Sequence, residues 1–170
     1  MMSPLVRKVA LTAHVTTSVG WLGAVGTFLA LAVTGVASGD GELVRGVYLA
    51  AEVTAWLVIV PLSVASLLSG LVQALGTPWG LVRHYWVLVK LALTVVATVL
   101  LLVHTRVVDQ VAEAAAARAL SGTDLAGMRT ELVVDAALAV VVLVITAALS
   151  VLKPRGVTGY GRRPRPAPAS

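Results

Sequence analysis

Four long apolar stretches run through the chain, separated and flanked by segments that carry most of its charged residues. They cover approximately residues 9–36, 46–75, 85–106 and 130–152. Each stretch is long enough for a helix to cross a bilayer, which takes ~20 mostly apolar residues. Because lipid offers the backbone no hydrogen-bond partner, such spans must be helical. The pattern predicts an all-α membrane protein, an antiparallel bundle of four transmembrane helices.

Basic residues flank these stretches unevenly. Arg7 and Lys8 precede the first stretch, and Arg83 lies between the second and the third. A basic group follows the fourth stretch: Lys153, Arg155, Arg162, Arg163 and Arg165. The other two connections mix acidic with basic residues. Since positively charged loops stay on the cytoplasmic side, we expect both termini to be cytoplasmic.

This orientation defines two regions. Residues 1–153 form the predicted transmembrane domain, in which 107–129 is an extracytoplasmic helical extension and loop. The extension is alanine-rich and is expected to end at Ser121 and Gly122, because glycine commonly terminates helices. Residues 154–170 are rich in Pro, Gly and Arg and are predicted to form a basic, disordered cytoplasmic tail. The tail serves as a topology anchor or binds anionic lipid headgroups.

Composition agrees with a membrane protein and removes several kinds of chemistry. Hydrophobic residues make up 58% of the chain and charged residues 12%, against ~25% charged in a typical soluble domain. There is no cysteine, which excludes disulfides, thiolate metal sites and thiol catalysis. Only three methionines are present, so a thioether-lined copper path is not expected. Much of the net charge of +5 lies in the tail, and we expect no nucleic-acid partner.

Polar residues recur at helical spacing within the spans. In the second span the stripe consists of Glu52, Trp56, Ile59, Ser63, Ser66, Gly70 and Gln73. In the third it consists of Lys90, Thr94, Ala97, Leu101 and His104, and in the fourth of Glu131, Asp135, Leu138 and Val142. Polar side chains avoid lipid, so these stripes are predicted to face the bundle interior. Lys90 is expected to extend its ammonium toward the inner membrane surface.

The first span has two different faces. One is a stripe of small residues suited to close helix packing: Thr16, Gly20, Gly23 and Thr27. The opposite face presents His14, Ser18 and Trp21. In the simplest interpretation, His14 forms a hydrogen bond with a neighbouring hydroxyl or carbonyl group. Alternatively, His14 and His84 ligate a b-type haem, since both fall toward the inner side and imidazole is a common iron ligand.

A second polar set falls toward the outer side: Glu52, His104 and Asp135. These residues are predicted to form a carboxylate–imidazole network within the membrane. The network acts as an ion-paired lock between helices or as a site of proton exchange. A metal site is a further alternative, and it requires three ligands to converge.

Three segments carry a resemblance to known proteins: "KVALTAHVTTSVGWLGAVGTFLALAV", "GLVRHYWVLVKLALTVVATVLLLVHT" and "SVLKPRGVTGYG". Together they resemble a family of uncharacterised four-helix integral membrane proteins common in high-GC Gram-positive bacteria. The resemblance implies four helices and a plasma-membrane location, and it brings no established activity. The chain is also distantly similar to the membrane domain of copper-resistance D-type proteins, through His14, Trp21 and Gly23. No metal ligands are carried over from that likeness.

Three functional hypotheses follow. The first is a structural or accessory membrane component without enzymatic activity, which associates with itself or with a membrane partner protein. The second is a redox protein that binds haem or a metal through His14 and His84. The third is a small proton-linked carrier that uses Glu52 and Asp135, although no internal repeat supports it.

Overall fold

The fold is helical throughout the part of the chain that the structure describes. The computed structural model describes residues 2–76, 84–120, 122–152, 156 and 158. Four of its helical stretches are long and apolar enough to cross a membrane: Pro4–Ala37, Gly41–Gly76, Tyr85–Ala116 and Asp124–Leu152. The prediction of an all-helical fold with four helices long and apolar enough to span a membrane is therefore confirmed for the described residues. Apart from Gly156 and Thr158, the predicted tail lies outside the described residues, as do Trp79 and Arg83.

The spans are longer than their apolar stretches because polar residues start and extend them. Helix α1 (Pro4–Ala37) begins with Ser3, whose hydroxyl accepts a hydrogen bond from the Val6 amide. Asp40 caps α2 (Gly41–Thr54) in the same way, accepting from the amides of Glu42 and Leu43. Such caps satisfy amides that have no partner within the helix. Helices α4 (Tyr85–Ala116) and α5 (Thr123–Leu152) also extend beyond the predicted spans.

The second span contains a change of helical geometry before its proline. A π-helical turn, η1 (Ala55–Ile59), joins α2 to α3 (Val60–Gly76). The amide of Val60 bonds to the carbonyl of Ala55, five residues back. Pro61 has no amide to donate, and its ring would clash with the carbonyl four residues earlier in a regular α-helix. The wider turn lies where this conflict arises, and insertions of this kind are a recognised cause of helix distortion.

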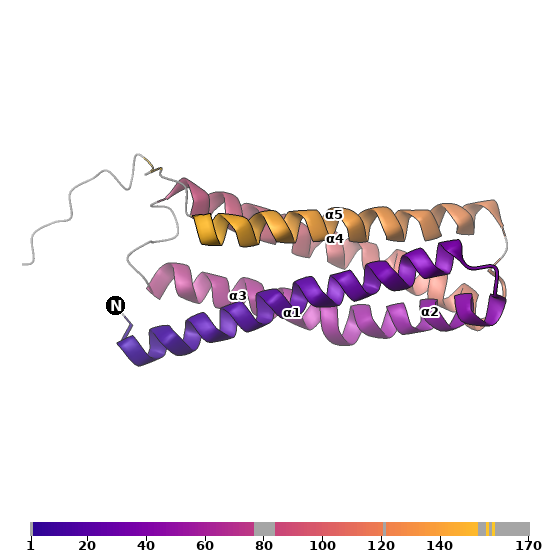
Figure 1. Cartoon of the computed structure of the whole chain (residues 1–170), viewed down its shortest axis with the longest axis horizontal. Helices are drawn as coiled ribbons and strands as arrows, with labels where there is room; N and C mark the ends of the chain where they lie inside the picture. Colours follow the sequence, from indigo (N-terminus) through magenta and orange to yellow (C-terminus); the bar gives the residue numbers. More distant parts are fainter. Residues whose placement is uncertain (1, 77–83, 121, 153–155, 157, 159–170) are drawn as a thin grey trace, which may run out of the picture.

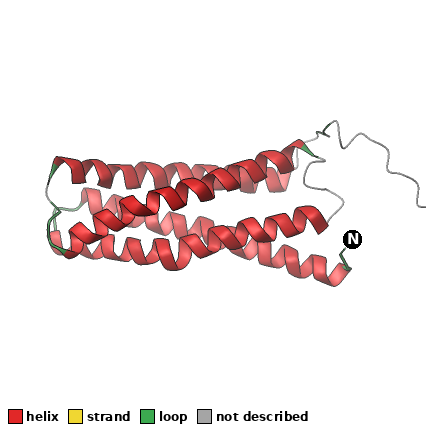
Figure 2. Cartoon of the chain, turned by 180° about the vertical axis from the view of Figure 1, so that it is seen from behind, coloured by secondary structure: helices red, strands yellow, loops and turns green. Residues whose placement is uncertain are grey.

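The four spans form a closed ring in which each contacts two neighbours. Helix α1 packs against α2, α3 and α5, and α4 packs against the same three helices. In Figure 1 the connection from α1 to α2 and the connection from α4 to α5 lie at one end, here called the loop end. The N-terminus and the last turns of α3 and α5 lie at the other, here called the terminal end. Figure 2 shows the same arrangement from behind.

Packing is dense toward the loop end. No described residue of α1 is buried before Trp21, whereas six are buried from there on: Trp21, Ala24, Val25, Phe28, Ala32 and Gly35. They join α2, α4 and α5 in one core cluster that includes Tyr48, Val111 and Leu132. The bundle therefore has a tight half around the loop end and a looser half around the terminal end.

Arg129 of α5 links three helices inside the tight half. Its Nε donates to the Tyr48 hydroxyl of α2 at 2.9 Å, and its Nη2 donates to the Gly35 carbonyl of α1. The guanidinium carbon lies 5.4 Å from the centre of the Tyr48 ring. A Cβ at Gly35 would stand 2.6 Å from the Tyr48 hydroxyl oxygen, so the approach requires glycine. Nothing in the sequence pattern singled out these three residues.

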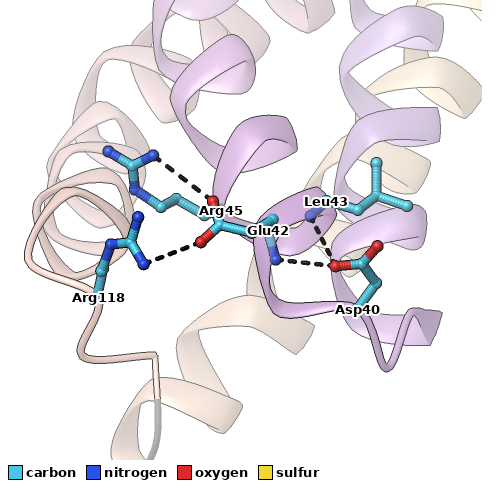
Figure 3. A network of polar contacts seen from close by, with 5 residues as sticks. All are labelled: Asp40, Glu42, Leu43, Arg45 and Arg118. Carbon is cyan, nitrogen blue, oxygen red and sulfur yellow. Dashed lines mark hydrogen bonds and ion pairs between the residues drawn. The ribbon is translucent and has the colours of Figure 1, made fainter.

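A network at the loop end fixes the two connections (Figure 3). Glu42 pairs with Arg118 at 3.0 Å and with Arg45 at 4.0 Å. Arg118 follows the end of α4 with a φ of 57°, and the amides of Arg118 and Ala119 bond back to Ala115 and Ala114. This is the usual pattern of a left-handed helix terminus, with arginine in the place that glycine favours. Helix α4 therefore ends before Ser121 and Gly122, and the terminus expected there is wrong.

We predict that Arg129→Gln destabilises the folded bundle by about 2 kcal/mol, because it removes hydrogen bonds from a charged group to partly buried acceptors. The measurement is thermal or denaturant unfolding of the purified protein in detergent. Arg106→Gln is the matched control, since Arg106 is exposed on α4. Equal stability of the two variants would contradict the role assigned to Arg129.

Candidate functional site

The polar interior residues gather in two clusters at different levels of the bundle. His104 contacts Glu131 and Asp135, whereas His14 contacts Ser69 and Lys90. The separation of His104 and Asp135 from His14 and Lys90 along the bundle agrees with the sequence analysis, whereas the side of the membrane on which each cluster lies stays a prediction. The membership of each set differs from the prediction, as described below.

The His104 cluster consists of His104, Glu131 and Asp135. His104 comes from α4, and the two carboxylates lie one turn apart on α5, where residues four apart share a face. His104 Nε2 lies 3.1 Å from Asp135 Oδ2 and 3.6 Å from Glu131 Oε1. One ligand atom from each residue lies within 4.8 Å of the other two. The cluster thus brings a nitrogen and two oxygens to one point.

A backbone contact orients the imidazole of His104. Its Nδ1 lies 2.8 Å from the carbonyl oxygen of Leu100. Because a carbonyl can only accept, Nδ1 carries the hydrogen and donates it. Nε2 therefore faces the carboxylates, either as the N–H of an imidazolium or as a lone pair directed at a shared cation. Metal-bound histidines show the same outer contact, with the second nitrogen donating to a carbonyl or carboxylate.

Glu131 occupies the place that the sequence analysis gave to Glu52. Glu52 forms no hydrogen bond or ion pair within the part of the chain that the structure describes. It belongs to α2, whose backbone packs against α1 and α4, whereas Asp135 belongs to α5 on the far side of the ring. Helical spacing gave part of the inward face of the second and third spans. The stripe predicted for the fourth span is wrong in part, because Glu131 and Leu138 are exposed whereas Leu132 and Ala136 are buried.

An apolar cavity adjoins the His104 cluster. Its volume is about 190 Å³, and His104 and Asp135 are among its lining residues. Most of the remaining lining is leucine, valine and alanine, and it reaches Trp21. The side chains of His104 and Asp135 are each 30% exposed, and that of Glu131 is 47% exposed. The cluster therefore has an apolar side toward the core and an accessible side.

The inner cluster forms a chain of hydrogen bonds around His14. Its Nδ1 lies 3.0 Å from the Ser69 hydroxyl, and its Nε2 lies 3.1 Å from Lys90 Nζ. Ser69 in turn donates to the Ser66 carbonyl at 3.1 Å. The expected bond between His14 and a neighbouring hydroxyl is confirmed. A Cβ at Gly70 would stand 3.1 Å from the imidazole, so glycine leaves room for the ring.

Lys90 does not extend to the membrane surface, and that expectation is wrong. It lies on the inward stripe of α4, and its ammonium is directed at His14 across the bundle. An ammonium can only donate, so His14 Nε2 accepts and Nδ1–H donates to Ser69. The lysine gains a partner inside the bundle that it would lack among lipid tails.

His84 lies just before α4, as its N-terminal flanking residue, with its ring 6.5 Å from that of Trp86. The two ring nitrogens of His14 are engaged by Ser69 and Lys90. A haem iron at His14 would therefore have to displace one of these partners. Haem ligation by His14 and His84 stays a prediction.

The two faces of α1 point in the expected opposite directions. Ser18 bonds to the Ser66 hydroxyl at 2.8 Å, and Trp21 is buried. On the small-residue face, Thr16, Gly23 and Thr27 are exposed. Gly20 alone of this face meets another helix closely, because a Cβ there would stand 3.3 Å from Leu62. Most of this face therefore packs against no other helix of the same chain.

One interaction was missed by the sequence analysis. Trp56 was assigned to the inward stripe of the second span, but its side chain lies at the surface, with the residue 43% exposed. Its indole Nε1 donates to Asp109 of α4 at 2.8 Å. Asp109 begins the polar extension of the third span, where no pairing could be inferred from spacing.

Comparison of the chain with protein-family models, with curated proteins and with solved structures finds no match. The functional argument therefore depends on the geometry of the two clusters.

Proposed function

We propose that this chain is a multi-pass plasma-membrane protein of accessory role that binds a divalent transition-metal ion at the His104 cluster. One observation carries the proposal: three ligand atoms from α4 and α5 converge at a point where the imidazole is already oriented by a backbone carbonyl. An ion between them would neutralise two carboxylates that lie within the span Asp124–Leu152.

The distances support a small ion. Zinc bonds to histidine nitrogen and carboxylate oxygen are ~2.0–2.2 Å long, which puts neighbouring ligand atoms ~3.3 Å apart in a tetrahedral site. The two nitrogen–oxygen distances of 3.1 and 3.6 Å lie on either side of that value. The carboxylate oxygens of Glu131 and Asp135 lie within 4.8 Å of each other, so an ion would be enclosed once side-chain rotations bring them to the same spacing. Three protein ligands leave the fourth position to water or to an exchangeable ligand.

The donor set favours Zn²⁺ or Mn²⁺ over copper. One imidazole with two carboxylates is a nitrogen–oxygen site, whereas Cu(I) is selected by thiolate and thioether ligands. The chain has no cysteine, and the His104 cluster contains no sulfur. Between the two favoured ions, Zn²⁺ is the first probe because its tetrahedral geometry suits the measured distances.

The distribution of basic residues supports the orientation. With Arg7 and Lys8 at one end and the basic residues after α5, the positive-inside rule favours cytoplasmic termini and an antiparallel bundle. The His104 cluster then lies toward the outer face, where extracellular ions have access to it.

We predict how many Zn²⁺ ions bind to the chain and which side chains the binding requires. We expect one Zn²⁺ per chain in a calorimetric titration of the detergent-purified protein. His104→Ala and Asp135→Asn should each weaken binding by about tenfold or more, because removing a ligand costs at least as much as removing its supporting partner. Glu131→Gln should weaken it as well.

Glu52→Gln is the matched control, since Glu52 is a carboxylate in a span but outside the cluster. We expect this variant to bind Zn²⁺ like the parent protein. Binding that is lost equally in Glu52→Gln, or that does not saturate at one ion per chain, would exclude the proposed site.

The orientation is tested by cysteine labelling, which the absence of native cysteine makes unambiguous. In intact cells, a membrane-impermeant maleimide should label Ser38→Cys and Ala119→Cys at the loop end. Met2→Cys should be labelled only after the cells are opened. The reverse pattern would invert the orientation and place the His104 cluster toward the cytoplasm.

Because Gly23 is exposed, the accessory role that it favours is self-association: two copies of the chain would pack through the small-residue face of α1. A Cβ at Gly23 meets nothing within 4 Å, so Gly23→Leu should leave the stability of the chain unchanged while reducing crosslinked dimers in membranes. Gly20→Leu should instead destabilise the chain by about 1–3 kcal/mol through overpacking against Leu62. Unchanged crosslinking of Gly23→Leu would reject this face as a contact between copies.

A further inference from the structure

A large cavity lies in the loosely packed half of the bundle. Its volume is about 670 Å³, within the range of ~300–1,000 Å³ that is usual for ligand sites. Helices α1, α3, α4 and α5 all contribute to its lining, from Arg7 and Trp86 near the terminal end to Trp21 and Leu143 at mid-bundle. Figure 1 shows the pair α1 and α3 diverging from the pair α4 and α5 toward this end. The cavity is distinct from the His104 cluster, none of whose residues lines it.

The charge of the cavity is of one sign. Arg7, Lys8 and Lys90 line it beside the neutral imidazole of His14, and none of the described lining residues is acidic. Lys90 has three donor hydrogens, and His14 is the acceptor that the structure records for it. A cavity with several cations and no carboxylate is complementary to an anion.

Trp21, which lines the inner end of the cavity, carries a hydrogen-bond donor without a partner. The indole Nε1 of Trp21 is buried and has no hydrogen-bond partner, although the residue is only 3% exposed. A buried donor without a partner costs free energy, and a bound acceptor removes that cost. Trp21 thus adds a second observation that points to a ligand in the cavity, independent of the cationic side chains.

The rim of the cavity is apolar and open toward the surroundings of the bundle. Leu11, Val15 and Val19 of α1 line the cavity and are each more than half exposed, and Val151 of α5 is 80% exposed. In a bilayer these side chains face hydrocarbon, so the opening between α1 and α5 suits an acyl chain. A phospholipid can place an acyl chain on this surface while its headgroup reaches the cations, whereas a soluble anion contacts the cations alone.

We propose that the cavity binds an anionic phospholipid, with its phosphate near Lys90, Arg7 and Lys8. An ester carbonyl of the lipid would accept the hydrogen bond from the Trp21 indole, and an acyl chain would lie along the rim between α1 and α5. The cations supply charge-assisted hydrogen bonds to the phosphate oxygens. The apolar rim distinguishes a lipid from free phosphate. The engagement of both His14 nitrogens distinguishes it from haem.

Native mass spectrometry of the detergent-purified full chain tests the proposal. Phosphatidylglycerol, phosphatidylcholine with the same acyl chains, and soluble glycerol phosphate are added in separate arms. We expect a one-to-one adduct with phosphatidylglycerol that persists at collision energies that remove phosphatidylcholine. Glycerol phosphate should neither form the adduct nor displace the lipid.

Two variants connect the adduct to the cavity. Lys90→Gln should weaken phosphatidylglycerol binding by about tenfold, as expected for a lost charged hydrogen bond, and Lys90→Arg should restore it. Trp21→Phe keeps an aromatic ring and removes only the donor, so it tests the cavity even if Lys90→Gln disturbs the His14 contact; it should weaken binding as well. Arg106→Gln removes a cation of α4 that does not line the cavity, and it should bind like the parent.

Three results would overturn the proposal. Equal retention of phosphatidylglycerol and phosphatidylcholine would show that charge does not select the occupant. Displacement by glycerol phosphate would identify a site for soluble phosphate. A Soret band in the purified protein that disappears in His14→Ala would assign the cavity to haem. Each outcome leaves the zinc titration at the His104 cluster unaffected.

Discussion

The absence of water inside a bilayer is the constraint on which this structure depends. Every polar group in a span must find its partner in the bundle or lie at its surface, because lipid tails offer none. Arg129 meets this requirement by bonding to Tyr48 and the Gly35 carbonyl. Lys90 meets it across the bundle at His14. The same requirement is only partly met in the His104 cluster and at Trp21, and these are two places where we propose a ligand.

Uneven packing separates those two places. From Trp21 to the loop end the helices share one buried core, and the His104 cluster lies beside it. Toward the terminal end the core gives way to the large cationic cavity. Trp21 lines both cavities and so marks the boundary between them. The proposed ion site and the proposed lipid site are compatible within one small bundle, because the two sites share no charged side chain.

The helices, and the inward face of the first, were predictable because hydrophobicity and helical spacing are local properties. His14, Ser18 and Trp21 accordingly point inward, as the spacing indicated. Partners were less predictable, because they depend on which helices are neighbours around the ring. The sequence analysis therefore paired Glu52 with His104, whereas Glu131 fills that position. The contact of Lys90 with His14 and the contacts of Arg129 were missed for the same reason, since the sequence does not show which helices are neighbours. Both also depend on close approaches between helices, at Gly35 beside Tyr48 and at Gly70 beside His14.

We propose that the His104 cluster holds a metal ion, and the most direct test is to identify the ligand atoms that surround the bound ion. Zinc K-edge absorption of the loaded, washed protein should show a first shell of nitrogen and oxygen at ~2.0–2.2 Å with the scattering signature of a single imidazole. His104→Ala should lose that imidazole signature. A six-coordinate shell of water, or an imidazole signature that persists in His104→Ala, would contradict the account.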